Sequence, residues 1–330
     1  MNAFERELAT AIGRATGEAF VPRRARAMRG GDISEAFTLG DGVRTFFVKT
    51  QPAPRPPAGR APVRGTPAGS PLLGSDPSAA SGGVPLAGAV TRIEMFEAEA
   101  AGLAELAAAN AVRVPRVICH GVVAGQAYLV LEFLPLQSHG DAAQLGRRLA
   151  QQHRVSAAQF GCARDNWIGA TPQPNAWMDG WVEFWRERRL GFQLKLAAQN
   201  GYGGALQRDG EALMARLDGF FTGYRPQPAL LHGDLWGGNH GFLADGSPVI
   251  FDPAVYFGDR ECDLAMSELF GGFAPPFYAA YREAWPLDAG YAVRRTLYNL
   301  YHILNHANLF GGGYAAQAQR MLAQLLAEIR

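Results

Sequence analysis

Apolar residues recur at helical or strand-like spacing along this chain, and the elements they predict follow a distinct order. Residues 3–15 predict an amphipathic helix, because apolar side chains fall on one face. Residues 29–50 predict a strand, a turn and a strand, with Asp41-Gly42 as a two-residue hairpin signal between apolar runs. Helical spacing returns over residues 91–109, and two more strands are expected at 112–123 and 126–133.

From about residue 141 the pattern becomes mainly helical. Two short apolar runs near residues 241–244 and 248–251 interrupt it and predict strands. The expected helical segments are 141–158, 179–199, 207–223, 261–284 and 290–328. A β-rich part with one helix therefore precedes a larger helical part, which is the outline of a protein kinase. We expect an α+β, bilobal protein-kinase-like fold, with lobes at 1–133 and 134–330.

The segment 51–90 interrupts the pattern of the first lobe. It is dense in Pro, Gly, Ala and Ser and has few apolar side chains to bury. Such a segment cannot offset its own ordering entropy, so we expect a flexible insertion.

Composition narrows the class of protein. The chain of 330 residues carries a formal net charge of +1, so no basic excess favours nucleic-acid binding. No apolar run approaches the roughly 18 residues of a membrane span, and we expect no signal peptide. Cys119, Cys162 and Cys262 are widely spaced and form neither a disulfide framework nor a zinc pattern. A cytoplasmic setting is the simplest expectation.

The segment 230–261 carries the strongest chemical signal. Asp234 lies in a His-Gly-Asp loop, Asn239 follows five residues later, and Asp252 follows the apolar strand 248–251. Phosphoryl transfer needs a carboxylate to orient the attacking hydroxyl and oxygen ligands for Mg²⁺. Protein kinases have the same Asp-to-Asn gap, followed by a strand and a metal-binding Asp. We therefore expect Asp234 to be the catalytic base and Asn239 and Asp252 to bind the metal.

Lys49 is the candidate cation for the nucleotide phosphates. The chain has only two lysines, Lys49 and Lys195, and Lys49 ends a predicted strand where a kinase fold places its phosphate-binding lysine. Glu99 on the following helix is the favoured partner for its ammonium group. Glu94 and Glu97 on the same helix are alternatives.

Other parts of a nucleotide site have weaker signals. A turn at Gly30-Gly31 would let backbone N–H groups approach phosphate oxygens. Glu132, Phe133 and Leu134 lie where the connection between the lobes would hydrogen-bond adenine through the backbone. The chain has no GxxxxGK[ST] or GxGxxG segment, so neither a Walker-type nor a Rossmann site is expected.

Taken with these motifs, the chain resembles the fructosamine/ketosamine-3-kinase family, which is related to aminoglycoside phosphotransferases and choline kinases. The matching stretches run over nearly the whole chain: GGDIS (30–34), FVK (47–49), MFEAEAAGL (95–103), RVPRVICHG (113–121), DNWIGATPQPN (165–175), LLHGDLWGGN (230–239), IFDPAVYFGDRECDLAMSELFGGF (250–273) and YHILNHANLFGGGY (301–314). The family sometimes has a cysteine in the first loop, but Ile33-Ser34 stand here, so we predict no redox switch.

The resemblance implies an ATP- and Mg²⁺-dependent kinase that phosphorylates the 3-hydroxyl of ketosamines. The acceptors would be small ketosamines or glycated protein lysines, and the unstable 3-phosphate would release the amine. By the same resemblance, Asp234 is the base, Asn239 and Asp252 hold Mg²⁺, and Lys49 with Glu99 positions ATP. Trp236 would line the sugar pocket. The chain would act as a monomer or a weak homodimer.

Several alternatives stay open from the residues alone. The fold also suits kinases of aminoglycosides, choline-like amino alcohols or plain sugars, and a catalytically inactive relative would only bind a partner. The helix face of His302, Asn305 and His306 indicates packing or, for His302, a substrate contact. Asp259 and Asp263 would brace the catalytic loop, and the repeat of Trp177, Trp181 and Trp185 favours a core position. A metal site of His232, His240 and Asp234 lacks supporting ligands.

Overall fold

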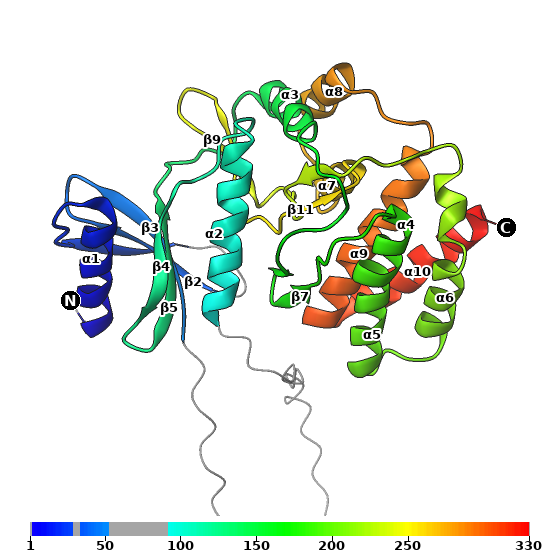
Figure 1. Cartoon of the computed structure of the whole chain (residues 1–330), viewed down its shortest axis with the longest axis horizontal. Helices are drawn as coiled ribbons and strands as arrows, with labels where there is room; N and C mark the ends of the chain where they lie inside the picture. The colour runs from blue at the N-terminus through cyan, green and yellow to red at the C-terminus, as the bar shows by residue number, and fades with distance from the viewer. Residues whose placement is uncertain (1, 29–33, 53–91, 330) are drawn as a thin grey trace, which may run out of the picture.

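The computed structural model describes residues 2–28, 34–52 and 92–329, which form one sheet-containing part and one mainly helical part (Figure 1). Gly30, Gly31 and nearly all of the predicted 51–90 insertion lie outside the described residues. The division of the chain at residue 133 stays a prediction.

The first part is built on a five-stranded antiparallel sheet in the order β1-β2-β3-β5-β4. Its strands are β1 Arg24–Met28, β2 Glu35–Gly40, β3 Thr45–Pro52, β4 Val117–Val123 and β5 Gln126–Glu132. Sequence analysis missed β1, because every residue of this edge strand is exposed and none is β-branched or aromatic. The predicted hairpin is present, but the prediction of a two-residue turn at Asp41-Gly42 is wrong, because residues 41–44 form the connection. Gly40 pairs with Thr45, and the intervening loop has an Asp41 N–H···O=C Arg44 bond of 3.1 Å.

Helices α1 (Ala3–Thr16) and α2 (Arg92–Ala108) cover opposite faces of the sheet (Figure 1). Phe46 and Val48 of β3 pack with α1, whereas Phe47 between them packs on the α2 side. Because strand side chains alternate between faces, Lys49 also lies on the α2 side. The alternation of β3 therefore aims this lysine at the helix that carries Glu99.

The second part is mainly helical, and three of the predicted long helices are broken. The segment predicted at 207–223 ends as an α-helix at Met214 and resumes as a 3-10 helix over Leu217–Phe221. The segment predicted at 261–284 is divided into two helices by three residues with positive φ, Phe270, Gly271 and Gly272. The segment predicted at 290–328 is divided in the same way at Gly311 and Gly312. In the described ranges, no helix is long and apolar enough to cross a membrane. The elements are α3 Ala142–Gln152, α4 Trp181–Phe184, η1 Trp185–Gly191, α5 Phe192–Gln199, α6 Ala205–Met214, η2 Leu217–Phe221, α7 Glu261–Glu268, α8 Pro275–Ala284, α9 Tyr291–Phe310 and α10 Gly313–Glu328.

Two short ribbons hold the segments with the chemical motifs. The strands predicted near 241–244 and 248–251 are confirmed as β9 (His240–Phe242) and β10 (Pro248–Ile250), which pair with each other. Strand β8 (Ala229–Leu231) pairs with β11 (Tyr256–Gly258). The loops between the two ribbons, 232–239 and 251–255, therefore run side by side. A third ribbon joins β6 (Asn166–Ile168) and β7 (Thr171–Gln173).

Candidate active site

The His232-Gly233-Asp234 turn is shaped by a close approach to the neighbouring loop. Gly233 has φ +84°, and a Cβ atom there would lie 2.0 Å from the carbonyl oxygen of Ala254. The Ala254 N–H donates to the carbonyl of His232 at 2.9 Å. Only glycine combines this φ with this contact, so the sequence His-Gly-Asp fixes how the two loops meet.

Asp263, on α7, braces this turn as predicted. Its carboxylate accepts the N–H groups of His232 (2.7 Å) and Gly233 (2.8 Å), and it lies 3.1 Å from His153 Nε2. Burial raises the pKa of Asp263, but the bonds it accepts outweigh this effect and hold the pKa below its usual value. Asp259 does not bond the catalytic loop; it accepts the hydroxyls of Tyr224 and Tyr298 instead.

Both ring nitrogens of His232 have partners within the loop. Its Nε2 donates to the carbonyl of Phe251 (3.0 Å), and its Nδ1 accepts the N–H of Asp234 (3.3 Å). Burial lowers the pKa of His232, which favours the neutral ring these bonds require. The ring of His240 packs on Phe273, with centroids 4.1 Å apart. His232 therefore holds the loop in shape while His240 packs among aromatic rings, and this arrangement argues against a metal site built from them.

Asn239 is hydrogen-bonded to both aspartates expected to do the chemistry, to the side chain of Asp234 and to the backbone of both. Its Nδ2 donates to the backbone carbonyl of Asp234 (2.9 Å), to Asp234 Oδ2 (3.2 Å) and to the carbonyl of Asp252 (3.4 Å). Burial, together with the neighbouring carboxylates of Asp252 and Asp263, raises the pKa of Asp234 to about 8, although the bond from Asn239 lowers it. A carboxylate with a pKa near neutrality is suited to general base chemistry.

Lys49 connects the sheet to the same loops. Its Nζ lies 2.7 Å from Glu99 Oε1 and 2.6 Å from Asp252 Oδ1. Glu99 therefore makes the ion pair, whereas Glu94 is exposed and Glu97 is half-buried. Burial alone would lower the pKa of Lys49, but the two carboxylates raise it above its usual value and keep the ammonium charged.

Asp252 has an unusual backbone conformation. Its φ is +61°, in the left-handed region that non-glycine residues rarely occupy. Such strain costs on the order of 1–3 kcal/mol and concentrates at functional sites. The side chain is 47% exposed, so one oxygen is bound to Lys49 while the carboxylate still faces solvent. The surrounding loops must hold this residue in place.

In the connection expected to bind adenine, residues 132–134, Glu132 already has hydrogen-bond partners within the protein. The carboxylate of Glu132 pairs with Arg113 (2.8 Å), and the Glu132 N–H donates to the carbonyl of Arg116 (2.8 Å). Within residues 2–28, 34–52 and 92–329, the backbone N–H groups of Phe133 and Leu134 have no acceptor. These two groups are therefore the ones open to a ligand.

An exposed group of aromatic rings lies beside the catalytic loop. Trp236 is 37% exposed and contacts Phe270, whose ring is 41% exposed and lies 4.8 Å from His306. His306 in turn contacts Phe310. Sequence analysis named Trp236 and placed His306 on a packing face, but it missed Phe270 and Phe310. Trp181 and Trp185 are buried as predicted, but Trp177 is exposed, so its core position is wrong.

His302 differs from its neighbour His306, one turn further along α9. It is only 4% exposed, and its Nδ1 is buried without a hydrogen-bond partner among the described residues. Burial, with a smaller effect from His306, lowers the pKa of His302 to about 3. Its substrate contact stays a prediction that this burial does not favour.

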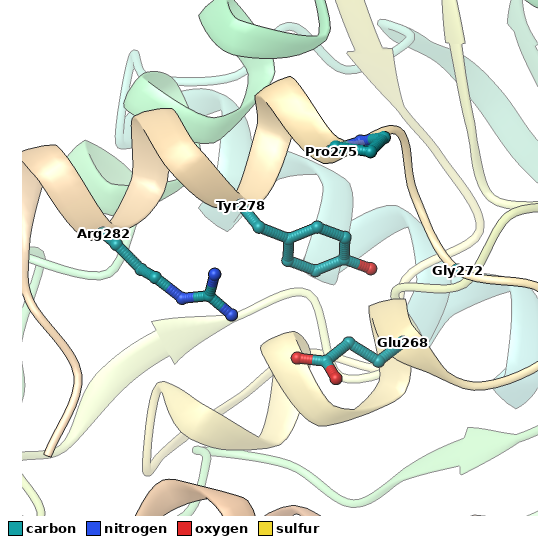
Figure 2. A pocket seen from close by; sticks show the side chains of 5 residues that line it. All are labelled: Glu268, Gly272, Pro275, Tyr278 and Arg282. Carbon is teal, nitrogen blue, oxygen red and sulfur yellow. The ribbon is translucent and has the colours of Figure 1, made fainter. Parts of the chain in front are cut away.

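A separate cavity of about 330 Å³ lies between α7 and α8 (Figure 2). Tyr278 and Arg282 of α8 and Glu268 of α7 project into it, and Glu268 accepts the hydroxyl of Tyr291 (2.7 Å). None of the predicted site residues lines this cavity. It therefore does not belong to the group of residues around Asp234.

The sheet with its ion-paired lysine and the helical part with two acidic loops define the class of small-molecule kinases with a protein-kinase-like fold. An aminoglycoside phosphotransferase APH(4)-Ia structure matches 97% of this chain and 98% of its own, with a TM-score of 0.55 at 14% identity, which shows the fold. A "putative fructosamine-3-kinase" from Haemophilus somnus matches 98% of both chains with a TM-score of 0.80 and 27% identity. The α+β bilobal prediction is confirmed.

The chain belongs to the fructosamine kinase family, whose sequence profile matches residues 88–328. A "probable ketoamine kinase" from Synechocystis is 42% identical over 322 residues, which cover 97% of this chain and 96% of the relative. A chloroplastic protein-ribulosamine 3-kinase from Arabidopsis thaliana is 43% identical over 236 residues, covering 70% and 72%. The family resemblance drawn from the motifs is therefore confirmed.

Proposed function

We propose that the protein is an ATP-dependent kinase that phosphorylates the 3-hydroxyl of ketosamines and so starts the removal of sugar adducts from amines. The observation that carries the proposal is the continuous set of contacts from Glu99 through Lys49 and Asp252 to Asn239 and Asp234, in a member of the fructosamine kinase family. The names of the Synechocystis and Arabidopsis relatives support ketosamines as the acceptor class.

The residues present fit a magnesium ion bound together with nucleotide phosphates. Asn239 uses only its Nδ2 in the described contacts, which leaves Oδ1 available, and the Asp252 carboxylate is half exposed. Across the described ranges, no cluster of three or more His, Cys, Asp or Glu could hold a metal. Mg²⁺ prefers few protein oxygens plus phosphate oxygens, which suits this pair. When bound, it would neutralise charge on the phosphates.

Each remaining residue has a part in the proposed reaction. Asp234 would accept the proton of the 3-hydroxyl as its oxygen attacks the γ-phosphorus, and its raised pKa favours this. Lys49 would bind the α and β phosphates while Glu99 holds its ammonium in place. Gly30 and Gly31 would approach the phosphates. The backbone of Glu132, Phe133 and Leu134 would bind adenine.

Trp236 would stack on the sugar, since its exposed ring lies two residues after Asp234. We further propose that the enzyme acts as a monomer or weak homodimer and that it is cytoplasmic, and its free thiols agree with the second of these proposals. Cys119, Cys162 and Cys262 are all unpaired in the structure.

The experiment is a measurement of ADP release with Mg·ATP against fructosyl-lysine, ribulosyl-lysine, a plain sugar, choline and an aminoglycoside. We expect turnover only with the two ketosamines, with free lysine appearing afterwards. Turnover confined to the other acceptors would refute the acceptor class but not the kinase fold. Bound ATP without turnover on any compound would indicate a binding protein.

A further inference from the structure

A group of buried polar side chains lies behind the catalytic loops. We call it the buried polar network; its members are Asn166, Gln173, Asn175, Arg189 and Tyr301. None is more than 7% exposed. Four of them lie within residues 166–189, on β6, β7, the loop after β7 and η1, and Tyr301 comes from the distant helix α9. The proposed reaction gives none of them a role.

Gln173 is the centre of the network. Its Nε2 donates to Asn166 Oδ1 (2.8 Å) and to the backbone carbonyl of Ala254 (3.1 Å). Its Oε1 accepts the hydroxyl of Tyr301 at 2.8 Å. Both ends of this amide are therefore satisfied, and its orientation is fixed by the donors and acceptors around it.

Asn166 and Asn175 extend the network in two directions. Asn166 Nδ2 donates to the carbonyl of Val255 (2.8 Å), and Asn166 Oδ1 accepts Asn175 Nδ2 (2.9 Å). Asn175 Oδ1 accepts Arg189 Nη2 at 2.8 Å. A continuous set of hydrogen bonds therefore leads from Arg189 to the backbone of residues 254–255.

Arg189 is a fully buried cation whose partners are neutral. Among the described residues, its guanidinium donates to the carbonyls of Pro174 and Arg188 and to Asn175 Oδ1, and its Nε has no acceptor. Its charge is instead stabilised by the carbonyl of Pro174 (2.7 Å) and by the rings of Tyr256 and Phe184, 4.1 and 4.6 Å away. Burying a charge without an ion pair is costly, so a rigid polar surrounding must compensate for it.

The network ends at the second of the two loops, 251–255, which carries Asp252. Gln173 and Asn166 hold the carbonyls of Ala254 and Val255, while the Ala254 N–H is bonded to His232. Asp252, with its strained φ of +61°, lies two residues before Ala254. Without fixed bonds on the following residues, the strained conformation could relax and move the carboxylate.

We propose that the buried polar network is a positioning device for Asp252: by fixing the carbonyls of Ala254 and Val255, it sets where the carboxylate stands against Asn239 and Asp234. The inference rests on the proposed role of Asp252 as a metal ligand. Partners that orient a metal ligand typically change metal affinity about 10–100-fold when they are removed. Loss of the network therefore weakens metal binding and slows turnover, beyond any loss of stability.

The test compares three variants of the full chain. Gln173→Leu removes all three bonds of the central amide, and Tyr301→Phe removes one of them with little change of shape. Gln207→Leu is the matched control, because Gln207 Nε2 also holds two backbone carbonyls, those of Leu194 and Tyr202, without contacting the catalytic loops. For each variant we would measure the Kd of Mn²⁺ in the presence of ADP by electron paramagnetic resonance, the melting temperature, and kcat with a ketosamine.

The expected result is a Kd for Mn²⁺ about tenfold higher in Gln173→Leu than in the wild type. Tyr301→Phe should show a smaller increase, and Gln207→Leu should lower the melting temperature with an unchanged Kd. If Gln173→Leu fails to fold, Tyr301→Phe decides. Wild-type Mn²⁺ affinity in Gln173→Leu, or in Tyr301→Phe if Gln173→Leu does not fold, would overturn the inference. Mn²⁺ binding needs no acceptor, so the result is independent of whether ketosamines are the substrate. A wild-type protein without Mn²⁺–ADP binding would refute the metal role of Asp252 and this inference together.

Discussion

His302 makes the stability of this protein depend on pH in a way that can be calculated. The ring projects from α9 into the protein interior, where its Nδ1 has no hydrogen-bond partner among the described residues. Burial is the largest cause that lowers its pKa from 6.5 to about 3. His306 and Arg189 also lower it, whereas Asp263 raises it. The folded protein therefore binds this proton less readily than the unfolded chain does. The stabilisation is complete above pH 6.5 and is lost as the pH falls towards 3.

The size of the effect follows from the two pKa values. At pH 7 the His302 ring is mostly neutral in the unfolded chain too. Its protonation there therefore lowers the free energy of unfolding by only a few tenths of a kcal/mol. At pH 5 nearly every unfolded chain carries the proton and almost no folded one does. The free energy of unfolding should then be lower than at pH 7 by about 2 kcal/mol from His302 alone. This is a sizeable part of the 5–15 kcal/mol typical of a folded domain.

The assay is urea unfolding at pH 7 and pH 5 for the wild type, His302→Phe and Asn299→Leu. Asn299 is the control, because it is a buried side chain on the same helix with an unpartnered Oδ1 but no proton to gain. His302→Phe should lose about 2 kcal/mol less than the wild type between the two pH values. Asn299→Leu should keep the wild-type difference. Equal pH dependence in all three proteins would refute the reasoning.

Three further substitutions test the site. Asp234→Asn should lower kcat at least about 100-fold with unchanged ADP affinity, and near wild-type turnover would refute the base assignment. Lys49→Arg should raise the KM for ATP about tenfold, because the larger guanidinium cannot occupy the space of an ammonium held by two carboxylates; an unchanged KM would contradict this. Gly233→Ala should cost about 2–4 kcal/mol in urea unfolding, since its Cβ would collide with the Ala254 carbonyl at positive φ. Gly237→Ala, which meets nothing within 4 Å, should cost far less.

The long elements of the fold were predictable because their apolar spacing is strong. α1, α2, β5 and the helical second part all follow from it. The three-residue strands β6, β7, β8 and β11 are too short to show any period, and tertiary pairing alone defines them. The break at Gly311-Gly312 had a readable signal in its glycines, whereas the left-handed φ of Phe270 had none.

For the site, residue spacing predicted which side chains meet but not how they are held. The ion pair of Lys49 with Glu99 followed from the position of each on its element. The positive φ of Asp252 and the bonds from Gln173 and Asn166 to the next residues depend on segments distant in the chain. The same holds for the contact of Phe270 with His306. No local pattern encodes such contacts.

The burial of Lys49 has a consequence for the protein's own exposure to sugars. Glycation begins when a free, unprotonated amine in solution attacks a sugar carbonyl. Lys49 is 13% exposed, and its ammonium is held between two carboxylates that keep it protonated. The chain's only other lysine, Lys195, is on the surface of α5, and the remaining 29 basic side chains are arginines. An enzyme proposed to repair sugar-damaged amines thus offers a single lysine side chain to the same damage, and the lysine proposed to bind its ATP is shielded from it.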